Sequence, residues 1–301
     1  MVNSANRRAV LRAAFGIAAV SAGLGHATLS SRRARAAGSG QGWVSVGSIA
    51  AQAIVDARVP LAAAGLGSEP ERMDVTAHVL RFRGETVLVG AGFGAHPGLP
   101  QGDLVGALAA RGLAPSQIDL VLLTHLHPEH VGGMVTADGA PVFANARVVC
   151  CRTEWRWWNE TDRPAGLPTA YQRFVPLARA ATRPYAQAQR PVTFTGTETV
   201  SQGIVGFPAL GHTAGHSLFR LVDGSSRLLT LGDTVLHATQ LADPNRTSAL
   251  DQHPESAART RRQILGDAVR ERWPVIGSQL AAPTVGRVRS NADGFVLDPW
   301  A

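Results

Sequence analysis

Residues 124–133 read Thr-His-Leu-His-Pro-Glu-His-Val-Gly-Gly, and this stretch decides how the rest of the chain is interpreted. It places three histidines and one carboxylate within residues 125–130, directly after the apolar run IDLVLLT. A short apolar run bounded by polar residues is typical of a buried strand. Imidazole nitrogens and carboxylate oxygens are the side-chain groups that bind zinc, iron and manganese. The stretch therefore predicts a metal site at the end of a strand.

Three further apolar runs also end in polar side chains. The run GIVGFPALG is followed by His212, RLLTLG by Asp233, and WPVIGS by Gln279. Ligands of an α/β sheet gather at one edge of it, where the ends of strands hold side chains rigidly. Each of these residues taken alone is more often an ordinary core or surface residue. Together with residues 125–130 they predict one shared metal centre.

The rest of the chain alternates between short apolar runs and helical segments. The runs are bounded by glycine or charge, and segments such as QGDLVGALAARG and PESAARTRRQILGDAVRER lie between them. This alternation predicts a layered α/β protein. After a flexible Gly/Ser-rich spacer at residues 37–42 we find no second linker and no repeat. We therefore expect a single domain at residues 43–301.

The first 36 residues have the pattern of an export signal. Arg7 and Arg8 precede the apolar run AAFGIAAVSAGLG, and the tripeptide ARA offers a cleavage site before Ala37. We expect residues 1–36 to be a twin-arginine signal peptide, and the mature protein to be periplasmic or secreted without a stable membrane span. An uncleaved amphipathic anchor is the alternative. N-terminal sequencing of the exported protein should find Ala37 first, and a start well before it contradicts cleavage there.

Charge and cysteine content limit the partners. The formal net charge is +7, but six of the positive charges are arginines in the first 36 residues, which contain no acid, so the remainder carries +1. We therefore expect a small-molecule substrate and no nucleic acid, with a homodimer as an open alternative. Cys150 and Cys151 are adjacent, and a disulfide between neighbours is strained, so two buried thiols are expected.

Residues 124–133 resemble the His-x-His-x-Asp-His signature of the metallo-β-lactamase superfamily, and GHTAGHS and LLTLGDT resemble its later metal motifs. The segments GFGAHPG, GDTVLHATQLADP and PVIGSQLAAPTVGRV look like the branch that contains methyl parathion hydrolase and lactonase-like enzymes. The resemblance extends over most of the chain after the spacer. It implies an αββα sandwich of two similar halves, with metals in the cleft between the edges of the sheets.

The resemblance also implies a ligand at each position of a two-metal centre. The first metal would be held by His125, His127 and His212, and the second by His130, Glu129 and Gln279. Asp233 would reach both metals and anchor a metal-activated hydroxide, and Glu129 would orient this hydroxide or receive its proton. Asp233 and Glu129 are thus the implied catalytic residues. Zinc, as one or two ions, is the expected cofactor, with iron and manganese as alternatives.

Three positions depart from the family pattern. Glu129 stands where the family has aspartate, Gln279 where it has histidine, and Gly90 where it usually has an aspartate behind the metal cleft. An amide oxygen is a poorer ligand than imidazole for a borderline-soft cation, and loss of an outer partner alone costs about 10- to 100-fold in affinity or activity. We therefore expect the second metal position to be weak, empty or differently loaded.

Two functional hypotheses follow. The first is a metal-dependent hydrolase of a small ester, lactone or organophosphate-like substrate, with β-lactam and thioester hydrolysis still open because one fold hosts many chemistries. The alternative is a degenerate member that keeps one metal or none and acts as a binding protein. Trp155, Trp158 and His237 are expected to line the substrate pocket, although a tryptophan-rich helix can equally be core.

Overall fold

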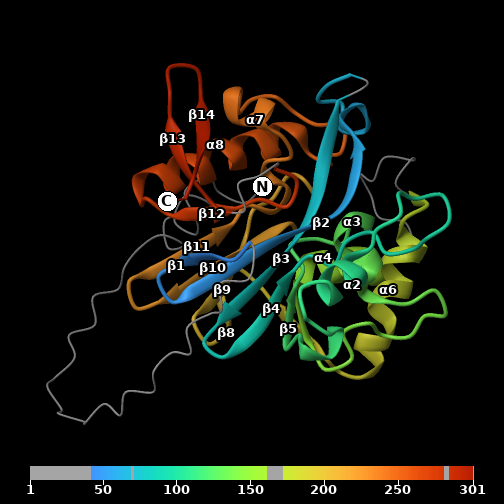
Figure 1. The fold of residues 1–301 in the computed structure, drawn as a ribbon. Coiled ribbons are helices and arrows are strands. Elements are labelled where there is room, and N and C mark those ends of the chain that lie inside the picture. Colours follow the sequence, from blue (N-terminus) through green and yellow to red (C-terminus); the bar gives the residue numbers. More distant parts are fainter. Residues whose placement is uncertain (1–41, 69–70, 161–171, 281–284, 301) are drawn as a thin grey trace, which may run out of the picture.

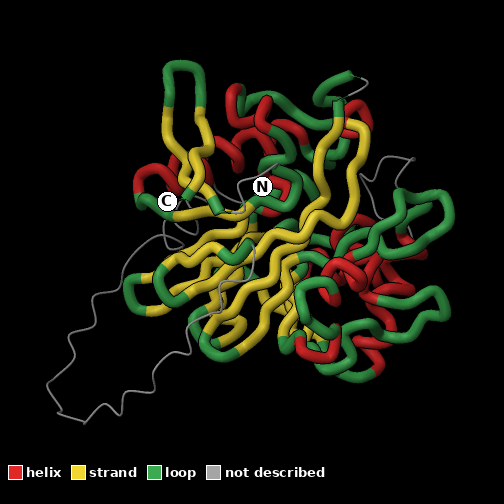
Figure 2. The backbone as a smooth tube through the Cα atoms, viewed as in Figure 1, coloured by secondary structure: helices red, strands yellow, loops and turns green. Residues whose placement is uncertain are grey.

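The computed structural model describes residues 42–68, 71–160, 172–280 and 285–300. The predicted signal peptide and residues 37–41 of the spacer lie outside the described residues. Two seven-stranded sheets pack against each other, and helices cover the outer face of each (Figure 1). The backbone trace shows the strands in the middle and helices on both sides (Figure 2). The expected αββα sandwich is confirmed.

The first sheet has the order β1-β2-β3-β4-β5-β6-β7. Its strands are β1 (Val44–Val46), β2 (Ile49–Pro60), β3 (Arg72–Phe82), β4 (Glu85–Val89), β5 (Leu120–Leu122), β6 (Arg147–Cys151) and β7 (Pro191–Phe194). The helices of this half are η1 (Leu61–Ala64), α2 (Leu104–Ala109), η2 (Pro115–Gln117), α3 (Pro128–Val131), η3 (Gly132–Met134), α4 (Arg152–Asn159) and α6 (Val175–Gln187). The pairs from β4 to β7 are parallel, and the pairs from β1 to β4 are antiparallel.

The second sheet has the order β14-β13-β12-β11-β10-β9-β8. Its strands are β8 (Glu198–Ser201), β9 (Ile204–Pro208), β10 (Ser217–Asp223), β11 (Ser226–Thr230), β12 (Pro274–Ile276), β13 (Gly286–Ser290) and β14 (Phe295–Pro299). The helices of this half are η4 (Gly232–Thr234), α7 (Ala238–Ala242) and α8 (Pro254–Arg270). Only the β11–β12 pair is parallel among the described strands of this sheet.

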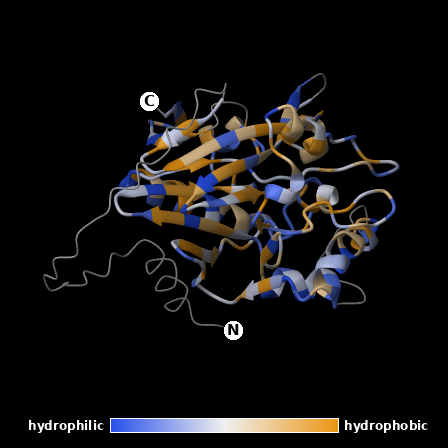
Figure 3. Ribbon diagram, turned by 60° about the horizontal axis from the view of Figure 1, so that its bottom comes forward, coloured by the Kyte–Doolittle hydropathy of each residue, from blue (hydrophilic) through white to orange (hydrophobic). Residues whose placement is uncertain are grey.

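Three apolar layers hold the sandwich together. Leu108 and Tyr185 belong to the layer between the first sheet and its helices. Leu122 and Phe219 belong to the layer between the two sheets, and Ile264 to the layer between the second sheet and α8. The hydrophobic colour is concentrated on the strands (Figure 3). Burying one such side chain contributes about 1.5–3 kcal/mol, so the three layers are the main source of stability.

The local sequence explains several of these elements. All three residues of β5 are buried, as expected for a parallel strand covered on both faces. Helix α2 begins after Asp103, whose side chain accepts from the Gly106 N–H, and α8 begins with Pro254 at its first position. Cys150 and Cys151 end β6 as buried free thiols, which confirms that prediction. None of the helices that the structure describes is long and apolar enough to span a membrane.

The hairpin of β2 and β3 extends well beyond the short parallel strands beside it (Figure 1). Its outer part joins an apolar cluster that includes Val59, Met73 and Phe93. The Thr76 N–H donates to the Ser278 carbonyl oxygen at 2.7 Å. The hairpin therefore reaches the loop that follows β12 and holds the backbone next to Gln279.

Candidate metal centre

The loop after β5 brings three histidines and a carboxylate to one edge of the first sheet. His127 is the residue before helix α3, and Pro128 begins this helix, so Glu129 and His130 lie in its single turn. The chain continues with helical backbone angles at Gly132, where η3 begins. A Cβ atom at this glycine would lie 2.0 Å from the Phe93 carbonyl oxygen, so only glycine fits there.

The second sheet supplies the opposing side chains from three separate loops. His212 follows β9, Asp233 lies in η4 after β11, and Gln279 follows β12. His125, His127 and His212 each offer one ring nitrogen, and these nitrogens lie within 4.8 Å of one another. The predicted convergence of four strand ends is thus present in the fold.

The first group of ligands, His125, His127 and His212, has the separations of a metal site. His212 Nε2 lies 3.1 Å from His127 Nδ1 and 3.6 Å from Asp233 Oδ2. Four ligands placed tetrahedrally about 2.1 Å from a zinc ion are about 3.4 Å apart. His125 Nε2 is fully buried, lies 3.8 Å from Asp233 Oδ2 and has no hydrogen-bond partner among the described residues. This donor set fits a cation.

Burial sets the charge state of two of these histidines. Burial, together with the neighbouring imidazoles, holds the pKa of His125 well below its ordinary value. Burial also holds the pKa of His127 well below its ordinary value, and His212 acts in the same direction. Both rings are therefore neutral at neutral pH, which is the form that binds metals.

The ring nitrogens that face away from the centre are also held. Thr124 Oγ1 lies 3.1 Å from His125 Nδ1, and Asp251 Oδ1 lies 3.0 Å from His212 Nδ1. A carboxylate behind a metal-binding histidine fixes its tautomer and raises its basicity. Asp251 could not be predicted from the motifs, because it belongs to a loop 39 residues after His212.

The second group of ligands lies beside the first. Ring and carboxylate atoms of His125, Glu129, His130 and Asp233 lie within 4.8 Å of one another. His130 Nε2 is 3.1 Å from Asp233 Oδ1, and Gln279 Nε2 is 3.3 Å from His130 Nε2. Burial alone raises the pKa of Asp233, but the charges of His130 and other histidines outweigh it and hold that pKa below its ordinary value. Asp233 is thus a carboxylate shared by both groups.

Comparison with known proteins identifies the family. Residues 71–276 match the family model of the Metallo-beta-lactamase superfamily. The chain belongs to this superfamily. No curated protein sequence matches it. The family resemblance predicted from the motifs is thereby confirmed.

Several solved structures share the superfamily fold. The hydrolase AbOPH of the beta lactamase superfamily has a TM-score of 0.78 at 24% identity, with 86% of this chain and 97% of that chain covered. AidC, a dizinc quorum-quenching lactonase solved with a product, has a TM-score of 0.75 at 19% identity and covers 86% and 98%. A probable metal-dependent hydrolase from Staphylococcus aureus has a TM-score of 0.71 at 16% identity and covers 85% and 99%.

Gly90 lies directly behind the second group of this superfamily centre. Its φ is +73°, and a Cβ atom there would lie 3.5 Å from His130 Nδ1. An acidic side chain at position 90 would therefore reach the outer nitrogen of His130. With glycine at this position, no carboxylate from residue 90 supports Nδ1 of His130. Nε2 of His130 is therefore a weaker ligand for a metal.

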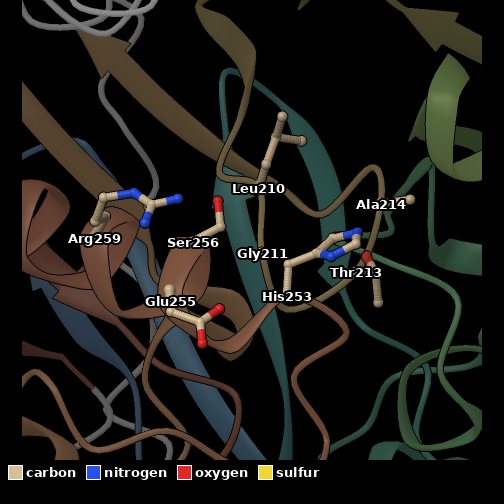
Figure 4. A pocket seen from close by; sticks show the side chains of 8 residues that line it. All are labelled: Leu210, Gly211, Thr213, Ala214, His253, Glu255, Ser256 and Arg259. Carbon is tan, nitrogen blue, oxygen red and sulfur yellow. The ribbon is translucent and has the colours of Figure 1, made fainter. Parts of the chain in front are cut away.

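A mostly apolar cavity of about 300 Å³ opens onto the second group. Val59, Met73 and Phe93 contribute to its apolar wall, and Glu129 and Gln279 lie at its polar end. A larger cavity of about 450 Å³ lies outside the loop after β9, against the first turn of α8 (Figure 4). Its lining includes none of the superfamily ligands. The smaller cavity borders the centre through Glu129 and Gln279.

The structure places the three residues predicted to line the substrate pocket at different distances from the centre. Trp158 is fully buried in the layer behind the first sheet, and Trp155 packs against the same layer. His237 precedes α7, where its Nδ1 accepts from the Thr239 N–H. None of the three is among the described residues that line the 300 Å³ cavity. The indole of Trp158 instead packs edge-on against His127, with ring centroids 5.7 Å apart, and so supports the first group from the core.

A residue missed by the sequence analysis joins the two histidine loops. Glu154 of α4 is fully buried. Its Oε1 accepts from the Leu126 N–H at 3.1 Å and from Trp158 Nε1 at 2.6 Å. Its Oε2 accepts from Thr213 Oγ1 at 2.7 Å and from the Gly215 N–H at 2.9 Å. The carboxylate thus ties the loop after β5 to the loop after β9.

Replacing Glu154 by glutamine should weaken this connection. The NH₂ group of Glu154→Gln would face two donors, and a buried donor without an acceptor costs about 1–3 kcal/mol. We expect a loss of about 2 kcal/mol in the free energy of unfolding, measured in urea. Glu160→Gln, at the exposed end of the same helix, should change it by less than about 0.5 kcal/mol. Equal effects of the two substitutions would refute the connecting role of Glu154.

Proposed function

We propose that this protein is a metal-dependent hydrolase of a small ester, lactone or organophosphate-like substrate. The observation that carries the proposal is that Glu129 and Gln279 belong both to the ligand cluster and to the apolar cavity. A molecule in the cavity would therefore meet the candidate centre directly. Membership of the superfamily supports the same reaction class, and we place the chain in its branch of methyl parathion hydrolase and lactonase-like enzymes.

The side chains divide the chemistry between them. A bound metal supplies a Lewis acid that polarises a carbonyl or phosphoryl oxygen and lowers the pKa of water. His125, His127 and His212 would hold a metal at the first position, and Asp233 would face the metals at both positions. Burial raises the pKa of Glu129, which lies at the polar end of the cavity. Its carboxylate is therefore suited to accept the proton of an attacking water and to hold it.

The cavity defines the kind of substrate. Its volume of about 300 Å³ is at the lower end of the range of about 300–1,000 Å³ for ligand pockets, which favours a small molecule. Its walls are apolar except for Glu129, Arg173 and Gln279. A neutral ester, lactone or phosphotriester with an apolar substituent satisfies both conditions, because its reacting group would lie at the polar end.

The proposal is tested with three substrates and one chelator. Purified protein is incubated with p-nitrophenyl butyrate, an N-acyl homoserine lactone and a dimethyl phosphotriester, before and after removal of metal. We expect hydrolysis of at least one substrate, its loss on chelation and its return with added zinc. Hydrolysis of none of them by the reloaded protein would favour the alternative of a binding protein, to which the replacements at 90, 129 and 279 also point.

A further inference from the structure

We infer that the second metal position is built for a harder divalent cation than the first. The centre would then hold zinc at His125, His127 and His212, and a manganese(II)-like cation between Glu129 and Gln279. The inference rests on the proposed function, because it concerns the same site, but it predicts a property that a hydrolase with one zinc or with two would lack.

The first position is rich in nitrogen. Three imidazoles surround it, and Asp233 Oδ2 approaches two of them at 3.6 and 3.8 Å. Asp251 supports one of these rings from behind. Zinc prefers such a set of imidazoles completed by one carboxylate.

The amide group of Gln279 lies where a metal ligand of the second position would lie. Its amide nitrogen Nε2 lies 3.3 Å from His130 Nε2 and 3.5 Å from Asp233 Oδ2. These separations match the spacing of about 3.4 Å between neighbouring ligands of one small cation. The amide end of Gln279 therefore lies where the histidine of the family pattern would place its ring nitrogen.

The oxygen of this amide could bind a cation, because no donor among the described residues occupies it. Gln279 is 1% exposed, and its Oε1 has no donor among the described residues. Rotating the amide by half a turn exchanges its oxygen and nitrogen, and only the oxygen can bind a cation. In that orientation the oxygen of Gln279 faces the same point as His130 and Asp233.

The second position is thus rich in oxygen. Glu129, Asp233 and Gln279 supply oxygen atoms, and His130 supplies the only imidazole that is not shared with the first position, since His125 belongs to both groups. His130 is also a weaker metal ligand than a histidine supported by a carboxylate, since Gly90 offers no carboxylate to its Nδ1. Carboxylate and carbonyl oxygens are the ligands that suit magnesium, calcium and manganese, whereas imidazole suits zinc. Since this position combines three oxygen ligands with His130 and a share of His125, manganese fits the set best.

The test compares two metals on the same metal-free protein. One sample is exposed to excess zinc chloride and gel-filtered, and its zinc content is measured by elemental analysis. A second sample receives one equivalent of zinc and is titrated with manganese chloride, while bound manganese is followed by electron paramagnetic resonance. We expect one retained zinc per chain in the first sample, and one further manganese bound beside zinc in the second.

Two substitutions at position 279 locate the effect. Gln279→His adds an imidazole, so two zinc ions should be retained and the preference for zinc over manganese at the second position should rise at least about tenfold. Gln279→Glu keeps the shape and strengthens the oxygen ligand, so manganese should bind at least about tenfold more tightly. If Gln279→His does not fold, the manganese affinity of Gln279→Glu still tests whether residue 279 binds the second cation.

Each other outcome contradicts the inference in a distinct way. Two retained zinc ions without manganese binding would show an ordinary two-zinc centre. One zinc without any manganese would leave a hydrolase with a single metal. Manganese binding that neither variant changes would lie at another site. No retained metal at all would overturn the proposed function together with the inference.

Discussion

Replacing His125 by alanine should abolish both metal retention and hydrolysis. His125 is fully buried, and it is the one histidine that belongs to both ligand groups. Thr124 Oγ1 lies 3.1 Å from its Nδ1, so Nε2 is directed toward the centre. Loss of an outer partner of a metal ligand costs about 10- to 100-fold, and loss of the ligand itself should exceed this, so we expect kcat/KM to fall by more than about 100-fold. The comparison is made with zinc-loaded wild type.

His253→Ala is the matched control for this prediction. His253 is an exposed histidine before helix α8, and its side chain makes no capping hydrogen bond. This variant should keep the kcat/KM and the metal content of the wild type. If His125→Ala hydrolyses the same substrates at the rate of His253→Ala, the reaction occurs outside the cluster.

Replacing Arg261 by methionine should cause the largest loss of stability. Arg261 is fully buried; its Nε donates to the Thr234 carbonyl at 2.7 Å, and its Nη1 to the Arg246 carbonyl at 2.7 Å. Its Nη2 lies 3.7 Å from Asp251 Oδ2, and Asp251 supports His212. Removing one partner of a buried ion pair costs about 3–5 kcal/mol. We expect a decrease of this size in the free energy of unfolding, measured in urea.

Arg262→Met separates this effect from the general loss of an arginine. Arg262 is the next residue of α8 and is exposed, so its replacement should change the free energy of unfolding by less than about 0.5 kcal/mol. Arg261→Met should also weaken zinc binding by about 10- to 100-fold, because Arg261 holds the segments that carry Asp233 and Asp251. Zinc affinity like that of Arg262→Met would show that Arg261 stabilises the fold without positioning the ligands.

The strand ends could be predicted from the sequence because local pattern determines them. A short apolar run followed by a histidine or an aspartate identifies both the strand and the side chain at its end, as His125, His212 and Asp233 illustrate. The superfamily motifs indicated in addition that these strand ends lie together at one metal centre. The fold and the location of the ligand cluster therefore followed from the sequence.

The supporting residues were harder to predict because they depend on helix rotation and on distant loops. Arg261 shares a helix face with the buried Ile264, Leu265 and Ala268, so its spacing indicated burial. The other arginines of this helix made the residue look like part of a solvated face. Glu154 precedes the buried Trp158 by four residues and faces the same way. The spacing of this helix could have placed Trp158 in the core, but no local pattern indicated that Asp251 would lie against His212.

The candidate centre is divided between the two sheets. The loop after β5 in the first sheet carries His125 and His130, whereas loops of the second sheet carry His212, Asp233 and Gln279. A cation bound by both sets would be a reversible cross-link between the two halves of the sandwich. A free cation at about a thousand times its dissociation constant adds about 4 kcal/mol to the stability of the folded chain. The supply of metal would thus set the free energy of unfolding of the chain as well as its chemistry.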